Sequence, residues 1–460
     1  MLRICVMLLI AVLSALFVGS ANAGPYLRYE NGMLSLEAQE VPLRDILAAL
    51  AGQGITAYLG DGLNPVISTR FDNRPVDEAF AGLLKGYDYS LIWREDADGG
   101  AVRLEEIRVF EPGRSEAVER VGSDGLAVVA GREGRLMIRD TVLIMAEKGV
   151  TRAGIASLVA PYAGVVADFD EQRGLALVRL PDGSDPEGVS ARMGQSDLVR
   201  IAEPDYVYEL PRAARIGGVP VPRSEPADPA VVESDALIAV LDSGVAEPYV
   251  DSGLLAGAYD AISASYRISD DSGHGTQMVL IAAGAVDPLG AAMQPRPSSP
   301  VLAVRIFDEH GYTSTSILKN AIDYAVRSQA RVVSMSWGSE TDSRVLESIV
   351  DYAADQGLIL VAAAGNEATG LPVYPAAYDR VIGVGALMPG GEVWPQSNYG
   401  SFVEVEMPGL ALFAEGGDEI SGIYAGTSIA AAYAARRISA VLAATPDAGR
   451  DAVLGELSRD

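Results

Sequence analysis

Five short apolar runs in the C-terminal half of the chain restrict its fold more than any other feature. They are ALIAVL from residue 236, VLAVRIF from 301, ARVVSMSW from 330, LILVAAAG from 358 and RVIGVGA from 380, with helical patterns between them. Strands that are apolar at every position are covered on both faces, as in a parallel sheet wrapped by helices. We therefore predict an α/β domain over residues 235–460, with ligands bound beyond the carboxyl ends of its strands.

The first half of the chain predicts two small α+β domains that share the order β-α-β-β-α-β. Residues 24–110 hold one of them, in which Leu43, Ile46, Leu47 and Leu50 form one helical face. Residues 139–210 hold the other, in which Thr151 is suited to cap the first helix. Residues 111–138 and the Pro-rich residues 211–234 lack periodicity, so we predict two linkers there.

The first 23 residues have the features of a secretory signal. Arg3 precedes an apolar run from Ile4 to Val18, and the small residues Ala21 and Ala23 suit a cleavage site after Ala23. The run is shorter than the roughly 20 residues of a spanning helix, so we expect no membrane span after signal removal. We expect an exported protein, either periplasmic or secreted.

The charge balance argues against one class of partner. The chain has 62 acidic and 35 basic residues and a formal net charge of -27. Such a surface repels a phosphate backbone, so we expect no binding to nucleic acid.

Three polar residues lie where predicted elements end or begin. Asp242 ends the first apolar run, His274 lies in DSGHGT before an apolar helix, and Ser428 lies in GTS before an Ala-rich helix. Taken singly, each motif is a common turn, loop or helix cap. Together they supply a hydroxyl nucleophile, an imidazole base and a carboxylate that orients the base. Asn366 ends a further apolar run, where its amide can stabilise an oxyanion beside the backbone N–H of Ser428.

From about residue 236 to 444, these segments resemble the subtilisin family of serine peptidases. VVSMSWGS, YPAAYDRVIGVGA and SNYGSFVEVEMPG extend the resemblance. It implies protein or peptide substrates that pair as extended strands, and a cis bond between Tyr374 and Pro375. It also implies one wall of the primary specificity pocket at 336–338, the opposite wall at 363–365 and a second substrate edge at 311–312. The substrate-binding residues are then Ser336, Trp337, Gly338, Ala363, Ala364, Gly365, Gly311 and Tyr312.

The sequence departs from the family pattern at two positions. Gln277 stands where a second histidine is common, and Ala432 replaces a common proline four residues after Ser428. His310 lies among turn residues, so we interpret it as structural. We assign no cofactor and no metal site. A sedolisin-like carboxyl peptidase shares the Gly-Thr-Ser motif but uses a glutamate where HGT stands here, which argues against it.

Two further resemblances concern the small domains. Residues 24–110 resemble the short N-terminal domain of secretins and TonB-dependent receptors, which implies a docking module for an envelope protein partner. Residues 139–210 look like the inhibitory propeptide of subtilisin-like enzymes, which makes 211–234 a processing linker. We therefore expect a serine endopeptidase made as a self-processing zymogen. The alternative is a catalytically inactive subtilisin-like scaffold that acts as an envelope binding protein.

Overall fold

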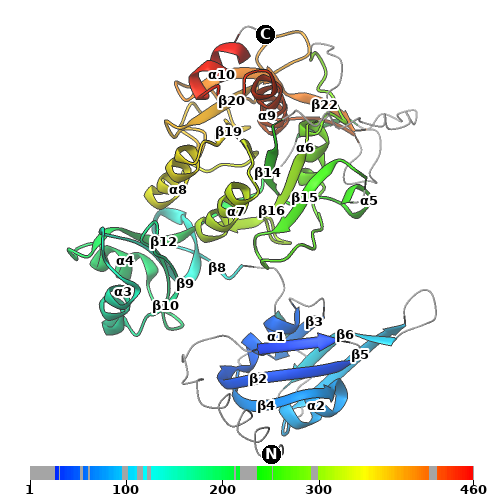
Figure 1. Ribbon diagram of the computed structural model, residues 1–460, viewed down its shortest axis with the longest axis vertical. Helices are drawn as coiled ribbons and strands as arrows, with labels where there is room; N and C mark the ends of the chain where they lie inside the picture. The colour runs from blue at the N-terminus through cyan, green and yellow to red at the C-terminus, as the bar shows by residue number, and fades with distance from the viewer. Residues whose placement is uncertain are drawn as a thin grey trace, which may run out of the picture. The chain divides into compact units, whose positions relative to one another are not determined.

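The structure, a computed structural model, divides into two compact units, residues 1–123 and 124–460. It describes residues 26–30, 32–51, 55–60, 63–95, 102–110, 118–121, 126–211, 214–217, 236–250, 252–291, 299–413 and 422–458. Figure 1 shows the elements of each unit. The predicted signal segment, residues 1–23, lies outside the described residues.

The described residues of the N-terminal unit form two sheets and two helices. One sheet has the order β1 (Tyr26–Glu30), β2 (Met33–Pro42), β4 (Val66–Pro75). The other has the order β5 (Asp88–Glu95), β6 (Val102–Phe110), β3 (Thr56–Gly60), β7 (Val118–Val121). The helices are α1 (Leu43–Ala51) and α2 (Val76–Leu83). Leu43, Leu47 and Leu50 of α1 share a core with Phe80 of α2, as the predicted apolar face requires. β7 belongs to the stretch that we expected to be a linker.

The second unit begins with a small α+β part, residues 136–209, which we call the small subdomain. Its elements are β9 (Leu136–Ala146), α3 (Arg152–Val159), β10 (Val165–Asp170), β11 (Leu175–Arg179), α4 (Pro186–Met193) and β12 (Val199–Glu209). This is the expected β-α-β-β-α-β order, and Thr151 caps α3 by accepting a hydrogen bond from the Gly154 N–H. A second short strand from the expected linker 111–138, β8 (Val128–Ala130), pairs with β9.

The rest of the second unit, residues 236–458, is the large subdomain. Its sheet has seven strands, and all neighbouring pairs are parallel. In spatial order the strands are β15 (Leu255–Asp260), β16 (Val301–Arg305), β14 (Ile238–Asp242), β18 (Val332–Met335), β19 (Ile359–Ala363), β20 (Val381–Leu387) and β21 (Val403–Pro408). The five predicted apolar runs form β14, β16, β18, β19 and β20, so the α/β prediction is confirmed.

Helices cover both faces of this sheet (Figure 1). α6 (His274–Ala282) and α9 (Thr427–Ala444) pack on one face, and α7 (Thr315–Arg327) and α8 (Arg344–Asp355) pack on the other. The smaller elements are α5 (Glu247–Val250), β17 (Tyr312–Ser314), β22 (Leu410–Phe413), β23 (Gly422–Ala425) and α10 (Arg450–Leu457). Across the described stretches of chain, none of the helices is long and apolar enough to cross a membrane.

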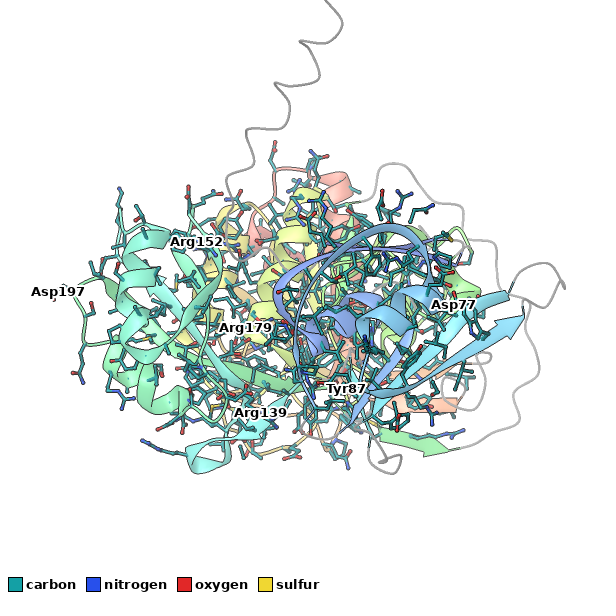
Figure 2. The ribbon with its side chains drawn as sticks, turned by 90° about the horizontal axis from the view of Figure 1, so that it is seen from below. Asp77, Tyr87, Arg139, Arg152, Arg179 and Asp197 are labelled. Carbon is teal, nitrogen blue, oxygen red and sulfur yellow. The ribbon has the colours of Figure 1, made fainter. Side chains whose placement is uncertain are left out.

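The small subdomain packs its sheet against α7 and α8, and its own helices α3 and α4 lie on the far side (Figure 1). Met137, Leu143 and Tyr208 share one apolar core with Leu318 of α7 and Leu346 of α8. Figure 2 shows Asp197, in the turn between α4 and β12, at the outer margin of the small subdomain.

Two carboxylates of β12, the buried Asp205 and the half-buried Glu203, extend this packing with hydrogen bonds. Glu203 accepts the N–H of Val345 and the hydroxyl of Ser343 at the start of α8. Asp205 accepts the N–H and the hydroxyl of Ser316 in the first turn of α7. Each carboxylate therefore satisfies donors at a helix N-terminus, where negative charge is stabilised.

Candidate active site

Asp242 and His274 form a close contact beyond the carboxyl end of the sheet. Asp242 is the last residue of β14 and His274 is the first of α6. The Nδ1 atom of His274 lies 2.7 Å from Oδ1 of Asp242, and both side chains are buried. A carboxylate at this distance fixes the proton on Nδ1, so Nε2 remains free to accept a proton.

The loop before α6 is shaped by two glycines and one carboxylate. Gly273 has φ +76, a left-handed conformation that favours glycine. A Cβ on Gly275 would lie 2.4 Å from the Gly244 carbonyl oxygen, so only glycine allows this approach. Asp270 accepts the N–H groups of Gly273 and Thr276 and the hydroxyl of Ser243. These bonds hold the start of α6 against the turn that follows Asp242.

Opposing effects set the pKa of His274. Burial disfavours the charged imidazolium and lowers the pKa, but the Asp242 charge, its hydrogen bond and the more distant Asp270 charge together outweigh burial. The pKa of His274 is therefore raised above the usual 6.5. Because a raised pKa means tighter proton binding, the imidazole is a better acceptor for the proton of a nucleophile.

Ser428 is the second residue of α9 and is 4% exposed. Its hydroxyl donates to the Ser336 carbonyl oxygen at 3.2 Å. The Nε2 atom of His274 is buried and has no hydrogen-bond partner among the described residues. The structure therefore brings Ser428 and His274 to one cleft without a hydrogen bond between them. Hydrogen bonds between catalytic groups are often long or poorly aligned when no substrate is bound.

Asn366 follows β19 and lies beside Thr427. Its Oδ1 atom accepts both the N–H and the hydroxyl of Thr427, each at 2.9 Å. The N–H donor identifies this atom as the amide oxygen, because a nitrogen would have to donate. The amide NH₂ group is then turned away from Thr427, on a residue that lines the same cleft as Ser428.

This cleft has a volume of about 1110 Å³. His274, Ser428 and Asn366 line it, and Asp242 lies buried behind His274. Of the expected substrate-binding residues, Ser336, Trp337, Gly338, Ala363, Gly365, Gly311 and Tyr312 also line it. Ala364 does not, because its side chain is buried and its N–H donates to the Val384 carbonyl oxygen on β20. The bond between Tyr374 and Pro375 is cis, which confirms that prediction.

The chain itself enters this cleft from two sides. β12 pairs in antiparallel fashion with β17, and the Leu210 N–H then donates to the Gly311 carbonyl oxygen at 2.8 Å. On the other side, β13 (Ala214–Gly217) pairs with β23, with Ala214 opposite Ala425. Glu209, Leu210, Pro211 and Ala214 line the cleft together with His274 and Ser428. The described residues on either side of 212–213 thus lie along the two edges of the cleft.

Sequence reasoning missed several charged residues of the site. Asp270 lies four residues before His274, and an acidic residue ahead of a helix start was the only available signal. Glu340 and Glu367 line the cleft, and each follows a segment predicted to form a pocket wall.

The two departures from the family pattern, Gln277 and Ala432, are both buried. Gln277 lines the cleft, whereas Ala432 does not. His310 lies in an exposed turn on the cleft rim. No group of three or more metal-ligating side chains occurs in the described ranges.

The chain is similar in sequence and in fold to several known proteins. Residues 233–456 match the model of the Subtilase family. The "Thermophilic serine proteinase" of Bacillus sp. (strain AK1) is 32% identical over 282 residues, which cover 59% of this chain and 70% of the relative. The "Subtilisin" of Bacillus pumilus is 33% identical over 220 residues, covering 46% of this chain and 78% of the relative. Fervidolysin from Fervidobacterium pennivorans has a similar fold, with a TM-score of 0.56 and 23% identity over 71% of this chain and 58% of its own.

The parallel sheet, the cleft and these relatives define a serine endopeptidase with an α/β fold. The chain belongs to the subtilase family.

Proposed function

We propose that the protein is an exported serine endopeptidase in which Ser428 is the nucleophile and His274 is the general base. Asp242 orients the imidazole, and Asn366 stabilises the oxyanion with the backbone N–H of Ser428. The observation that carries the proposal is the 2.7 Å contact between Asp242 and His274 in a cleft that Ser428 and Asn366 also reach. Ser336, Trp337, Gly338, Ala363, Gly365, Gly311 and Tyr312 bind the substrate chain.

The reaction has two halves. Ser428 Oγ turns from the Ser336 carbonyl toward His274, passes its proton to Nε2 and bonds to the substrate carbonyl carbon. The amide NH₂ of Asn366 donates to the oxyanion that develops. His274 then gives the proton to the leaving amine as the C–N bond breaks. In the second half, water gives a proton to Nε2 and bonds to the acyl carbon, and the ester bond breaks as Ser428 regains its proton.

The protein is made as a zymogen that cuts itself. The supporting observation is the course of the chain, which pairs with β17 up to Leu210 and with β23 from Ala214. Ala425, the partner of Ala214, lies three residues before Ser428. The self-processed bond therefore lies between Pro211 and Ala214, within the processing linker 211–234. The small subdomain, as part of the inhibitor domain 139–210, keeps the cleft closed after the cut through its contacts with α7 and α8.

This order of domains has a consequence for residues 24–110. If they form the docking domain that their sequence resembles, self-processing separates them covalently from the enzyme. They then act as an escort or a sensor that binds an envelope protein. Cleavage of the signal after Ala23 would deliver the precursor to the periplasm or the outside of the cell.

One experiment tests these statements together. The wild type and Ser428→Ala are purified and incubated with an unfolded protein, and the products and the enzyme's own new N-termini are sequenced. The proposal expects peptide products and a new enzyme N-terminus at residue 212, 213 or 214, both absent in Ser428→Ala. Active material with an intact N-terminus at Gly24 would refute release of the N-terminal domains. A wild type that binds but never cuts would support the inactive scaffold instead.

A further inference from the structure

The cleft carries an excess of negative charge from the large subdomain. Five carboxylates of this subdomain line it, against one arginine and two histidines. The arginine, Arg305, is buried and its Nη1 lies 3.0 Å from Oδ2 of Asp260, so its charge is already compensated. An extended substrate therefore meets a negative field along most of the cleft.

Two of these carboxylates stand at equivalent places on the two expected pocket walls. Glu340 lies two residues after Gly338, and Glu367 lies two residues after Gly365. Both line the cleft and both are exposed. Among the described residues, neither side chain has an ion-pair partner or a hydrogen bond. Each of the two expected pocket walls is thus followed in the sequence by an exposed, cleft-lining carboxylate that is available to a ligand.

Asp308 differs from these two, although it lines the same cleft. It is buried, and the N–H groups of Leu126, His310 and Tyr312 donate to its carboxylate. It adds to the negative field, but its oxygens are already in use. Asp271 and Glu309 also line the cleft, but Glu340 and Glu367 are the two carboxylates next to the expected pocket walls.

The protein's own sequence agrees with this charge. The two residues between Pro211 and Ala214, where we place the self-processed bond, are Arg212 and Ala213. Arg215 follows on β13. The sequence thus carries two arginines within four residues of Pro211, which lines the cleft.

We propose that this endopeptidase prefers substrates with arginine or lysine on the amino side of the cut bond, and that Glu340 and Glu367 are the residues that determine this specificity. The inference rests on the proposed function. A cationic side chain that enters the pocket lies between two carboxylates, whereas an acidic side chain there is repelled. Exposed pairs of this kind each contribute about 0.2–1 kcal/mol, which corresponds to roughly 1.5- to fivefold in kcat/KM.

The test uses peptide amides that differ only in the residue before a fluorogenic leaving group. Arginine is compared with citrulline, which has nearly the same shape without the charge, and with leucine and glutamate. The ratio of kcat/KM for arginine to that for citrulline is measured for the processed wild type, Glu340→Gln, Glu367→Gln and the double variant. Glu392→Gln removes the same charge from an exposed loop outside the cleft and serves as the control.

The proposal expects the ratio to exceed 1 in the wild type and to fall about 1.5- to fivefold in each single variant. It expects a value near 1 in the double variant, the wild-type value in Glu392→Gln, and a decrease with added salt. Equal rates for arginine and citrulline in the wild type, or an unchanged ratio in the double variant, would overturn the specificity proposal while the leucine peptide is still cut. Failure to cut any of the four peptides or an unfolded protein would overturn the proposed function itself.

Discussion

Asp242 and His274, which are 32 residues apart in the chain, lie with Oδ1 and Nδ1 only 2.7 Å apart. The sheet and the glycine-rich turn bring them together, because β14 ends at the same edge where α6 begins. The carboxylate is 1% exposed, so its charge acts on the imidazole with little screening by water.

This contact predicts the effect of Asp242→Asn. An asparagine keeps the size of the side chain, but its NH₂ group favours the tautomer in which Nε2 carries the proton, and that nitrogen cannot act as a base. We expect kcat to fall about 10³- to 10⁴-fold at neutral pH. Steady-state kinetics with a peptide amide measures it, with the melting temperature as a check on folding. A loss below tenfold in a folded variant would argue against this role for Asp242.

Asn366→Ala removes the amide that faces the cleft. Because the oxyanion forms only during the reaction, we expect kcat to fall about 10²- to 10³-fold with little change in KM. Thr427→Val is the matched control, since it removes the hydroxyl that donates to Asn366 Oδ1 and accepts from the Gly365 N–H, but it leaves the amide NH₂ in place. A similar loss in the control would mean that the alanine variant disturbs the start of α9 rather than the oxyanion.

The raised pKa of His274 predicts the pH dependence of activity. The base works in its neutral form, so kcat/KM should rise with pH through a midpoint above 6.5. In Asp270→Asn one of the two carboxylate charges that favour the imidazolium is lost, and this midpoint should move to lower pH. The measurement is kcat/KM from pH 5 to pH 9. A variant with lower activity but an unchanged midpoint would show that Asp270 only holds the loop in place.

Asp205 predicts how stability changes with pH. Burial raises the pKa of Asp205 to about 6, although the hydrogen bonds from Ser316 and Ser314 favour the charged form. Since the folded pKa is above the ordinary value of 3.8, the folded state binds the proton more tightly. The contribution of Asp205 is therefore largest below about pH 4 and decreases as pH rises through about 6.

Denaturant unfolding of the full chain checks this, with Ser428→Ala as the background so that self-cleavage does not interfere. Asp205→Asn stays neutral at every pH. The stability of this variant relative to its Ser428→Ala parent should therefore increase from pH 4 to pH 7. A difference that is independent of pH, or that changes in the opposite direction, would contradict the raised pKa.

The central strands could be predicted because they are buried on both faces, which leaves a continuous apolar run such as that of β14. The edge strands β15 and β21 could not, because half-buried strands such as LAGAYD mix exposed and buried positions. The start of α6 at His274 was predicted from its glycines, whereas the conformation of the Ser428 hydroxyl depends on the Ser336 carbonyl, 92 residues away in sequence.

The contacts between the small and the large subdomain could not be predicted from the sequence either. Glu203 and Asp205 belong to a segment that resembles a propeptide, but their hydrogen-bond partners lie more than 100 residues further along the chain. Nothing in the local pattern of AEPDYVYEL indicates that two of its carboxylates contact the first turns of α7 and α8. Only the packing of the small subdomain against these helices determines which carboxylates become buried.

Labelling of Ser428 tests most directly whether this serine is an activated nucleophile. Processed protein is treated with a fluorophosphonate, and the modified residue is located by mass spectrometry of its peptides. We expect a single adduct on Ser428 of the processed wild type and no adduct in Ser428→Ala, which stays unprocessed. A folded, processed protein that reacts elsewhere or not at all would contradict the catalytic role assigned to this serine.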